Sequence, residues 1–256
     1  MKLFCKIGIA VMCIMILTGV VLRTLGEDYI ITSSTSGKKL PIYCVDRDDK
    51  KISLSFDAAW GNEDTQNILD ILAKHDVKVT FFMTGGWVSS FPDDVKAIAA
   101  AGHDLGNHSE NHKQMSQLSM EQCKEELQLV HDKVKELTGI EMTLFRPPYG
   151  DYNNTVVEAT ASMGYRCVQW DVDSLDWKDY GTDSIINTIC NHKHLGSGSI
   201  ILMHNGAKYT PAALDTMITN LKEQGYEFVP LSQLLLEGQY EVDYTMDHEG
   251  RQRKIQ

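Results

Sequence analysis

Segments typical of β-strands and of α-helices alternate along most of this chain. Residues 52–56 have the alternating pattern of a strand, and residues 62–75 carry apolar side chains at helical spacing. The alternation continues to a strand at 227–229 and a short helix at 231–236. It predicts an α/β fold in which helices cover a parallel sheet. Because about seven such units follow one another, we expect a distorted (β/α)7-type barrel with functional side chains at the carboxyl ends of its strands.

The first residues of the chain differ from the rest. An uncharged apolar run at 7–22 follows Lys2 and Lys6 and precedes Arg23. A positive flank before an apolar run is typical of an export signal or a membrane anchor. No clear small-x-small cleavage motif follows the run, so we favour an uncleaved apolar anchor helix over a cleaved signal peptide. In both cases we expect the remaining chain to lie outside the cytoplasm, membrane-anchored or secreted.

These features divide the chain into four expected parts. Residues 1–26 would be the signal or membrane anchor, and residues 27–48 a linker with little periodicity. Residues 49–238 would form the α/β domain. The polar residues 239–256 would form a disordered tail.

Charge and cysteine content exclude two kinds of site. The net charge is −11 and no cluster of Lys and Arg stands out, which argues against nucleic acid as a partner because phosphate binding needs clustered cations. The six cysteines contain no C-x-x-C pair, which argues against a cysteine zinc site. We expect Cys44, Cys123, Cys167 and Cys190 to be ordinary buried thiols.

Most of the predicted strands end in ionisable side chains. These are Asp57, His108, His112, Arg146, Asp173, Asp176 and His204. Charge scattered over a surface would not recur at strand ends so regularly. Because these ends meet at one face of a barrel, the sequence predicts a single site there.

Each of these residue types has a functional and a structural interpretation. His108 and His112 are four residues apart, a spacing that suits two metal ligands on one helical turn but also two surface histidines. They do not form H-E-x-x-H, so a metalloprotease would lack its general base. Arg146 precedes two prolines and could hold a carboxylate or stand in a structural turn. His204 ends an apolar strand and is either a core histidine or a catalytic acid.

Five segments together resemble a known family. SFD, HSENH, RPPYG, DSLDW and LMH, in this order and spacing, resemble the motifs of the NodB-homology polysaccharide deacetylases, carbohydrate esterase family 4. The resemblance covers residues 50–237, and its variant first motif is similar to the sporulation-associated branch. It implies the NodB-homology barrel and metal-assisted N-deacetylation of a cell-wall polysaccharide such as peptidoglycan.

The resemblance also implies how the first half of the site works. His108 and His112 would hold a divalent metal, commonly zinc, which polarises the acetyl carbonyl and activates a water. Asp57 would be the general base that takes the proton of this water. Arg146 would pair with Asp57 and keep it ionised.

The second half of the site follows from the same resemblance. His204 would be the general acid that protonates the leaving amine, and Asp176 would orient its ring. The backbone N–H of Tyr149 would help to stabilise the oxyanion. Trp177 and Leu202 would form the walls of the acetyl pocket.

Ala58 departs from the family pattern, because the usual first motif has a second aspartate there that serves as the third metal ligand. Without it the site is expected to bind metal more weakly. Asp57 itself could ligate the metal, or Asn62, Glu63 or Asp64 could supply a replacement oxygen. A third possibility is a metal-poor protein that is slow or inactive. Because the other motifs are intact, we favour a polysaccharide deacetylase over a weakly active or inactive carbohydrate-binding relative.

Two other classes make different demands on the sequence. A binding module would hold sugars on aromatic surfaces such as Trp60, Trp87, Tyr149 and Trp177, and would keep binding after loss of the catalytic groups. A glycoside hydrolase would need two carboxylates about 5–9.5 Å apart across the sugar. An acid at His204 argues against that class.

Overall fold

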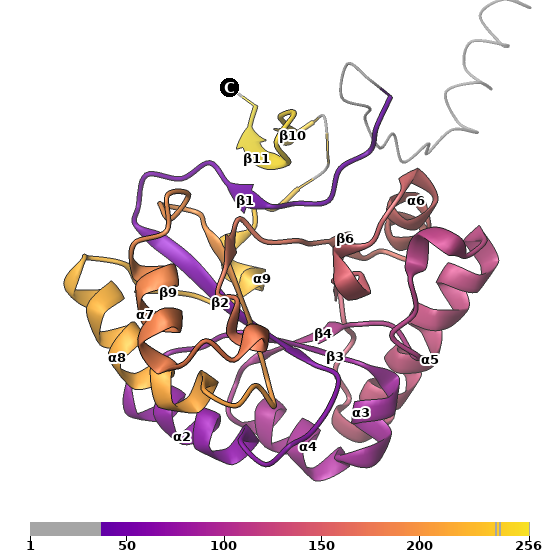
Figure 1. Ribbon diagram of the computed structural model, residues 1–256. Coiled ribbons are helices and arrows are strands. Elements are labelled where there is room, and N and C mark those ends of the chain that lie inside the picture. The colour runs from indigo at the N-terminus through magenta and orange to yellow at the C-terminus, as the bar shows by residue number, and fades with distance from the viewer. Residues whose placement is uncertain (1–36, 239, 241, 256) are drawn as a thin grey trace, which may run out of the picture. The chain divides into compact units, whose positions relative to one another are not determined.

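A computed structural model describes residues 37–238, 240 and 242–255, and within them a parallel sheet carries the site (Figure 1). The order of its strands is β6-β5-β4-β3-β2-β8-β7, and β9 pairs with β2. Every one of these pairings is parallel. The strands are β2 (Lys51–Ala58), β3 (Thr80–Met83), β4 (Asp104–Asn107), β5 (Leu144–Phe145), β6 (Arg166–Cys167), β7 (Val172–Asp173), β8 (Ile200–His204) and β9 (Glu227–Phe228).

Helices lie around the outside of this sheet (Figure 1). They are α2 (Thr65–Lys74), α3 (Gly85–Ser90), α4 (Pro92–Ala100), α5 (Met120–Thr138), α6 (Asn154–Ser162), α7 (Thr182–Cys190) and α8 (Thr210–Glu223). The short helix α9 (Leu231–Leu234) instead lies within this ring, beside β2 (Figure 1). The long helix α5 begins at a capping box, in which Ser119 and Gln122 satisfy each other's backbone N–H, and ends at Gly139 with φ 75°. Helix α3 was not expected, because its first two residues are glycines; Thr84 caps it through the N–H of Trp87.

The two edge strands of the sheet, β6 and β7, are consecutive in the sequence, within residues 166–173. Strand β6 pairs with β5, through Cys167 and Phe145, and β7 pairs with β8, through Val172 and Ile201. The sheet thus curls into a half-barrel with helices outside, consistent with the expected distorted (β/α) barrel. The parallel sheet covered by helices is confirmed.

The expected linker and tail are partly folded against each other. Strands β1 (Cys44–Val45), β11 (Arg251–Lys254) and β10 (Tyr244–Met246) form a small second sheet. The disordered tail is therefore a wrong prediction for these residues. The polar composition of the tail suggested disorder, but a polar residue such as Gln252 can be fully buried when it is hydrogen-bonded. Its side-chain amide pairs with the backbone N–H and C=O of Leu236.

The expected anchor falls outside the part of the chain that the structure describes. Residues 1–36 are not described. Within the described residues, no helix combines the length and the apolar character needed to cross a membrane. The four expected buried thiols are confirmed: Cys44, Cys123, Cys167 and Cys190 are buried and free.

Candidate active site

The carboxyl ends of the strands surround a cavity of about 470 Å³. Its lining comprises Asp57, Trp60, His108, His112, Tyr149, Trp170, Asp173, Trp177, Leu202 and His204. Seven of the nine predicted site residues are among them. The other two, Arg146 and Asp176, are fully buried and contact lining residues from behind. The structure thus brings all nine together, as the barrel prediction requires.

Three lining residues were not assigned a part in the deacetylation site from the sequence, and one of them, Asp173, was noted only as an ionisable strand-end residue. Trp60 was considered only as a sugar-stacking surface, and Trp170 was not considered at all. Trp170 lies between β6 and β7, two residues before the start of β7, so its nearness to the quoted DSLDW motif was the available signal. Its ring lies 5.6 Å from the Arg146 guanidinium carbon, which no spacing in the sequence indicates.

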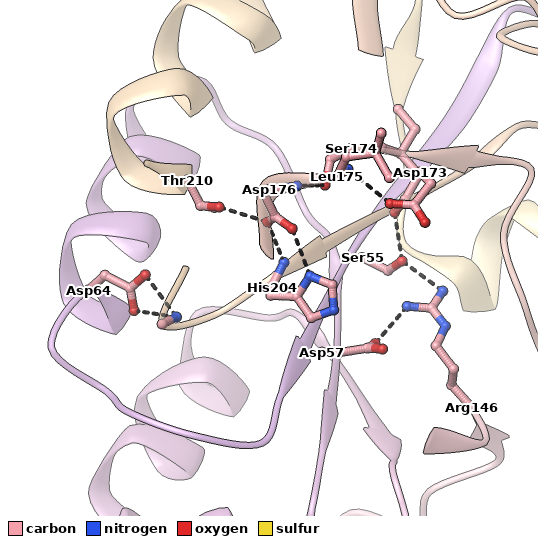
Figure 2. Close-up of polar contacts among 12 residues, drawn as sticks. Ser55, Asp57, Asp64, Arg146, Asp173, Ser174, Leu175, Asp176, His204 and Thr210 are labelled. Atoms are coloured by element: carbon pink, nitrogen blue, oxygen red, sulfur yellow. Dashed lines mark hydrogen bonds and ion pairs between the residues drawn. The ribbon is translucent and has the colours of Figure 1, made fainter. Parts of the chain in front are cut away.

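Asp57 and Arg146 form a buried ion pair (Figure 2). Nη1 of Arg146 donates to Oδ1 of Asp57 at 2.8 Å, and Nη2 donates to the hydroxyl of Ser55 at 2.8 Å. The guanidinium also lies over the ring of Phe82, at 4.2 Å from its centre. Burial opposes the ionisation of Asp57, but the charge of Arg146, with His108 and His204 nearby, holds the pKa of this carboxyl below its ordinary value. Asp57 is therefore an ionised carboxylate at neutral pH.

Asp176 holds His204 at two points. Nδ1 of His204 donates to Oδ1 of Asp176 at 2.7 Å, and the backbone N–H of His204 donates to Oδ2 at 2.7 Å (Figure 2). The hydroxyl of Thr210 donates to the same Oδ2 at 2.7 Å. Burial alone would lower the pKa of His204, but the hydrogen bond and charge of Asp176 raise it above its ordinary value. The remaining ring nitrogen, Nε2, is left as the proton-exchanging atom on the cavity side.

His108 is oriented by the backbone of the arginine that holds Asp57. Its Nδ1 lies 2.7 Å from the carbonyl oxygen of Arg146. A carbonyl can only accept, so the hydrogen is on Nδ1 and the lone pair is on Nε2. Burial lowers the pKa of His108 to about 4, so the ring is neutral near pH 7. Nε2 then faces Oδ2 of Asp57 at 3.5 Å.

The loop after β4 presents His112 in an unusual conformation. Its φ is 52°, and that of Ser109 in the same loop is 65°. Asn107 holds the loop at one end, through its side-chain oxygen and the N–H of Ser109. Glu126 on α5 holds the other end by accepting from the backbone and side-chain N–H groups of Asn111, both at 2.8 Å. Such conformations persist only where the surrounding contacts enforce them.

The donor set of the site fits a divalent cation in part. His108 and Asp57 present two acceptors to each other with no proton between them, an arrangement that a cation would satisfy. The ring of His112 lies beside that of His108, with centres 5.0 Å apart. In the described part of the chain, however, no three His, Cys, Asp or Glu side chains converge as a complete metal site. At position 58, where the resemblance implies a third ligand, the chain has a fully buried alanine.

One of the alternatives for the missing ligand, a replacement oxygen from residues 62–64, is not found. The side chain of Asn62 donates to Asp94 at 2.7 Å, and both carboxylate oxygens of Asp64 accept from the N–H of Gly206. Neither these residues nor Glu63 lines the cavity. That hypothesis is therefore wrong, because the loop folds toward α4 and toward the end of β8 instead of into the site.

Comparison with known proteins places the chain in a family. The family model described as polysaccharide deacetylase matches residues 45–168. The peptidoglycan-N-acetylmuramic acid deacetylase PdaA of Bacillus subtilis is 36% identical over 197 residues, which are 74% of this chain and 73% of that protein. The chain belongs to the polysaccharide deacetylase family.

Two further relatives bear on its activity. The peptidoglycan-N-acetylglucosamine deacetylase PgdA of Listeria monocytogenes is 36% identical over 199 residues, 78% of this chain but only 42% of that protein. The crystal structure of BA3943 from Bacillus anthracis, described as a carbohydrate esterase family 4 pseudoenzyme, matches with a TM-score of 0.74 and 37% identity, covering 80% of this chain and 71% of that one. A mutant of BA3943 described as having restored enzymatic activity matches with the same TM-score. The chain is thus similar both to named deacetylases and to a pseudoenzyme.

Proposed function

We propose that this chain is a hydrolase that removes N-acetyl groups from a cell-wall polysaccharide, with peptidoglycan as the favoured substrate. One observation carries the proposal: an ionised carboxylate and a carboxylate-held imidazole line the same cavity, each fixed by a fully buried partner. The names of PdaA and PgdA support peptidoglycan as the polymer.

Asp57 acts as the general base. Its Oδ1 is bound to Arg146, and its Oδ2 faces the cavity beside His108. A water held there lies within reach of a carboxylate that stays ionised at neutral pH, because Arg146 lowers its pKa. Arg146 itself is buried and acts only by holding and charging Asp57.

His204 acts as the general acid. Asp176 accepts the hydrogen bond from its Nδ1, so the proton to be donated is on Nε2. The raised pKa of His204 favours the ring's protonated state near neutral pH. The leaving amine takes this proton as the C–N bond breaks. The buried position of Asp176, with Thr210 as a further partner, fixes the direction of the ring.

His108 and His112 would hold the divalent metal, with zinc as the favoured ion. When bound, such a metal supplies a Lewis acid for the acetyl carbonyl. The neutral state of His108 and the hydrogen bond at its Nδ1 are what a ligating imidazole needs. With Ala58 in place of a carboxylate ligand, we expect weaker binding than in relatives with the complete set.

Trp177, Leu202 and Tyr149 are the lining residues proposed to bind the acetyl group. Trp177 and Leu202 form apolar walls beside His204. Tyr149 is 68% exposed and has φ 61°, a conformation that turns the backbone between Pro148 and Gly150. Its N–H is the proposed donor to the oxyanion.

An inactive carbohydrate-binding relative is the second candidate, and Ala58 favours it together with the likeness to BA3943. The two candidates separate in one experiment on the full chain in detergent. Metal content and acetate release from peptidoglycan are measured for the wild type, Ala58→Asp and His204→Gln. Acetate release by the wild type that His204→Gln abolishes supports the enzyme. Acetate release by Ala58→Asp alone supports the inactive relative.

The wider setting of the protein also belongs to the proposal. We infer a distorted (β/α)7-type barrel, anchored or exported through the apolar residues 7–22, with the domain at 49–238 outside the cytoplasm. A role in sporulation follows only from the resemblance of the first motif. Protease digestion of intact cells tests the placement, because an exported domain is cleaved while a cytoplasmic one is protected.

A further inference from the structure

Trp60 is the one lining residue of the cavity that stacks on the general acid. The centres of the Trp60 and His204 rings are 5.6 Å apart and their planes differ by 21°. Trp60 is 46% exposed, so one face of the indole covers the imidazole and the rest remains open to solvent. From this geometry we propose that Trp60 is a positioning residue that holds the His204 ring and favours its protonated state, a role that rests on the proposed function of His204.

The stacking is built by two loops that bind each other. The loop after β2 contains Trp60, and the loop after β8 contains Gly206. A Cβ at Gly206, where φ is 89°, would lie 2.7 Å from the Trp60 carbonyl oxygen and 3.1 Å from its Cδ1. Only glycine allows this approach, because any side chain would push the indole away from the site.

Hydrogen bonds fix the same arrangement from both sides. The carbonyl of Gly61 accepts from the indole N–H of Trp87 at 2.7 Å and from the side chain of Asn205 at 3.3 Å. The carboxylate of Asp64 accepts from the N–H of Gly206 at 3.0 and 2.9 Å (Figure 2). The backbone of the loop that carries Trp60 is therefore held by Trp87 and by the two residues that follow His204. A residue that merely covered the surface would not need these contacts.

The chemistry of the pair explains why an indole is useful here. Asp176 fixes Nδ1 of His204 but leaves a face of the ring uncovered, and stacking restricts the tilt that remains. The electron-rich face of an indole attracts a cation, so stacking favours imidazolium over imidazole. The other charged or titratable groups that act on His204 are Asp176, Asp57, Asp173 and His112. A substitution at Trp60 alters none of these four side chains in the sequence.

Two substitutions separate stacking from simple shielding. Trp60→Phe keeps a flat aromatic face, and Trp60→Leu keeps an apolar side chain without one. If Trp60 stacks as proposed, the pKa of His204, measured by NMR titration of the metal-free full chain, falls by about half a unit in Trp60→Leu and is largely kept in Trp60→Phe. If Trp60 only shields His204 from water, Trp60→Leu raises this pKa, because burial lowers it and the leucine admits water. A rise would overturn the proposal.

The activity measurement gives an independent readout. The proposal expects Trp60→Leu to lower kcat about tenfold with little change in KM, and Trp60→Phe to recover most of the loss. A rise in KM at unchanged kcat would overturn it, because that result marks a substrate-binding surface. Tyr180→Leu is the matched control, since Tyr180 is 66% exposed and is absent from the cavity lining. If neither the wild type nor any variant releases acetate, the proposed function has failed. The NMR titration then still decides whether Trp60 acts on His204.

Discussion

Arg146 holds Asp57 through a hydrogen bond of 2.8 Å while its own backbone carbonyl orients His108. One residue thus fixes both the carboxylate proposed as the base and an imidazole proposed as a metal ligand. Arg146 is fully buried, and its guanidinium also reaches Ser55 and the carbonyl of Gln169. The pair therefore depends on a network that tolerates little change.

Removing Arg146 alone should be costly for stability. Arg146→Met leaves Asp57 as an unpaired buried carboxylate, so we expect the free energy of unfolding to fall by about 3–5 kcal/mol. Arg146→Met combined with Asp57→Asn should cost less than the sum of the two single changes, because no charge is then left without a partner. Urea unfolding of the four proteins measures both effects, and additive losses would show that the ion pair does not act as a unit.

The alkaline limit of activity should depend on Asp176. His204 donates a proton only while it is protonated, and Asp176 raises its pKa. In Asp176→Asn the charge is lost, so the alkaline limb of kcat/KM should move down by about 1–3 pH units. The pH profile of acetate release measures this, and an unmoved alkaline limb would contradict the assignment of His204 as the acid.

The same pair makes a stability prediction with a defined sign. The folded-state pKa of His204 lies above its unfolded value of about 6.5. The stabilisation from Asp176 is therefore complete below about pH 6.5 and is lost as the pH rises through the folded-state pKa. Thermal unfolding of wild type and Asp176→Asn across this range should show a difference that shrinks as the pH increases. A difference that grows toward alkaline pH would contradict it.

Glu126 should stabilise the loop that carries His112. Glu126→Ala leaves the backbone N–H of Asn111 without its acceptor, at a cost of about 1–3 kcal/mol in unfolding free energy. Zinc binding, measured by calorimetry, should weaken in the same variant because His112 loses its enforced conformation. The matched control is Glu125→Ala, since Glu125 is an exposed neighbour on the same helix. Equal effects of the two substitutions would show that the loop does not depend on Glu126.

Ala58→Asp should couple stability to metal. Position 58 is fully buried, so a carboxylate there is destabilising until a cation pairs with it. We expect a lower melting temperature than wild type without metal and a larger rise on adding zinc. Differential scanning calorimetry with and without zinc tests this, and an equal rise in both proteins would mean that position 58 does not reach the cation.

The sequence predicts most of this arrangement because parallel strands of one sheet place their carboxyl ends, and the residues there, at the same edge. Asp57, His108, Arg146 and His204 come together because each lies within one residue of the carboxyl end of a parallel strand. Contacts between loops could not be predicted from the sequence in the same way. The approach of Trp60 to Gly206 depends on a positive φ and on hydrogen bonds that no spacing encodes.

The folded tail was missed for a different physical reason. Its strands bury few apolar residues, and Gln252 is satisfied by the backbone of Leu236. A polar composition cannot reveal such pairing, because it resembles that of a disordered segment. The segment 62–64 was misjudged as a source of metal ligands for a similar reason, since nearness in sequence to Asp57 does not fix the direction of a loop.

Acetate release from peptidoglycan, compared between the wild type and His204→Gln with added zinc, tests the central claim most directly. The claim is that Asp57 and His204 perform hydrolysis although Ala58 replaces a ligand. It predicts measurable release by the wild type and a loss of about 10²–10⁴-fold in His204→Gln. Release that is absent from the wild type at every zinc concentration, in a folded protein that still binds the polymer, would contradict it and identify the chain as a binding relative.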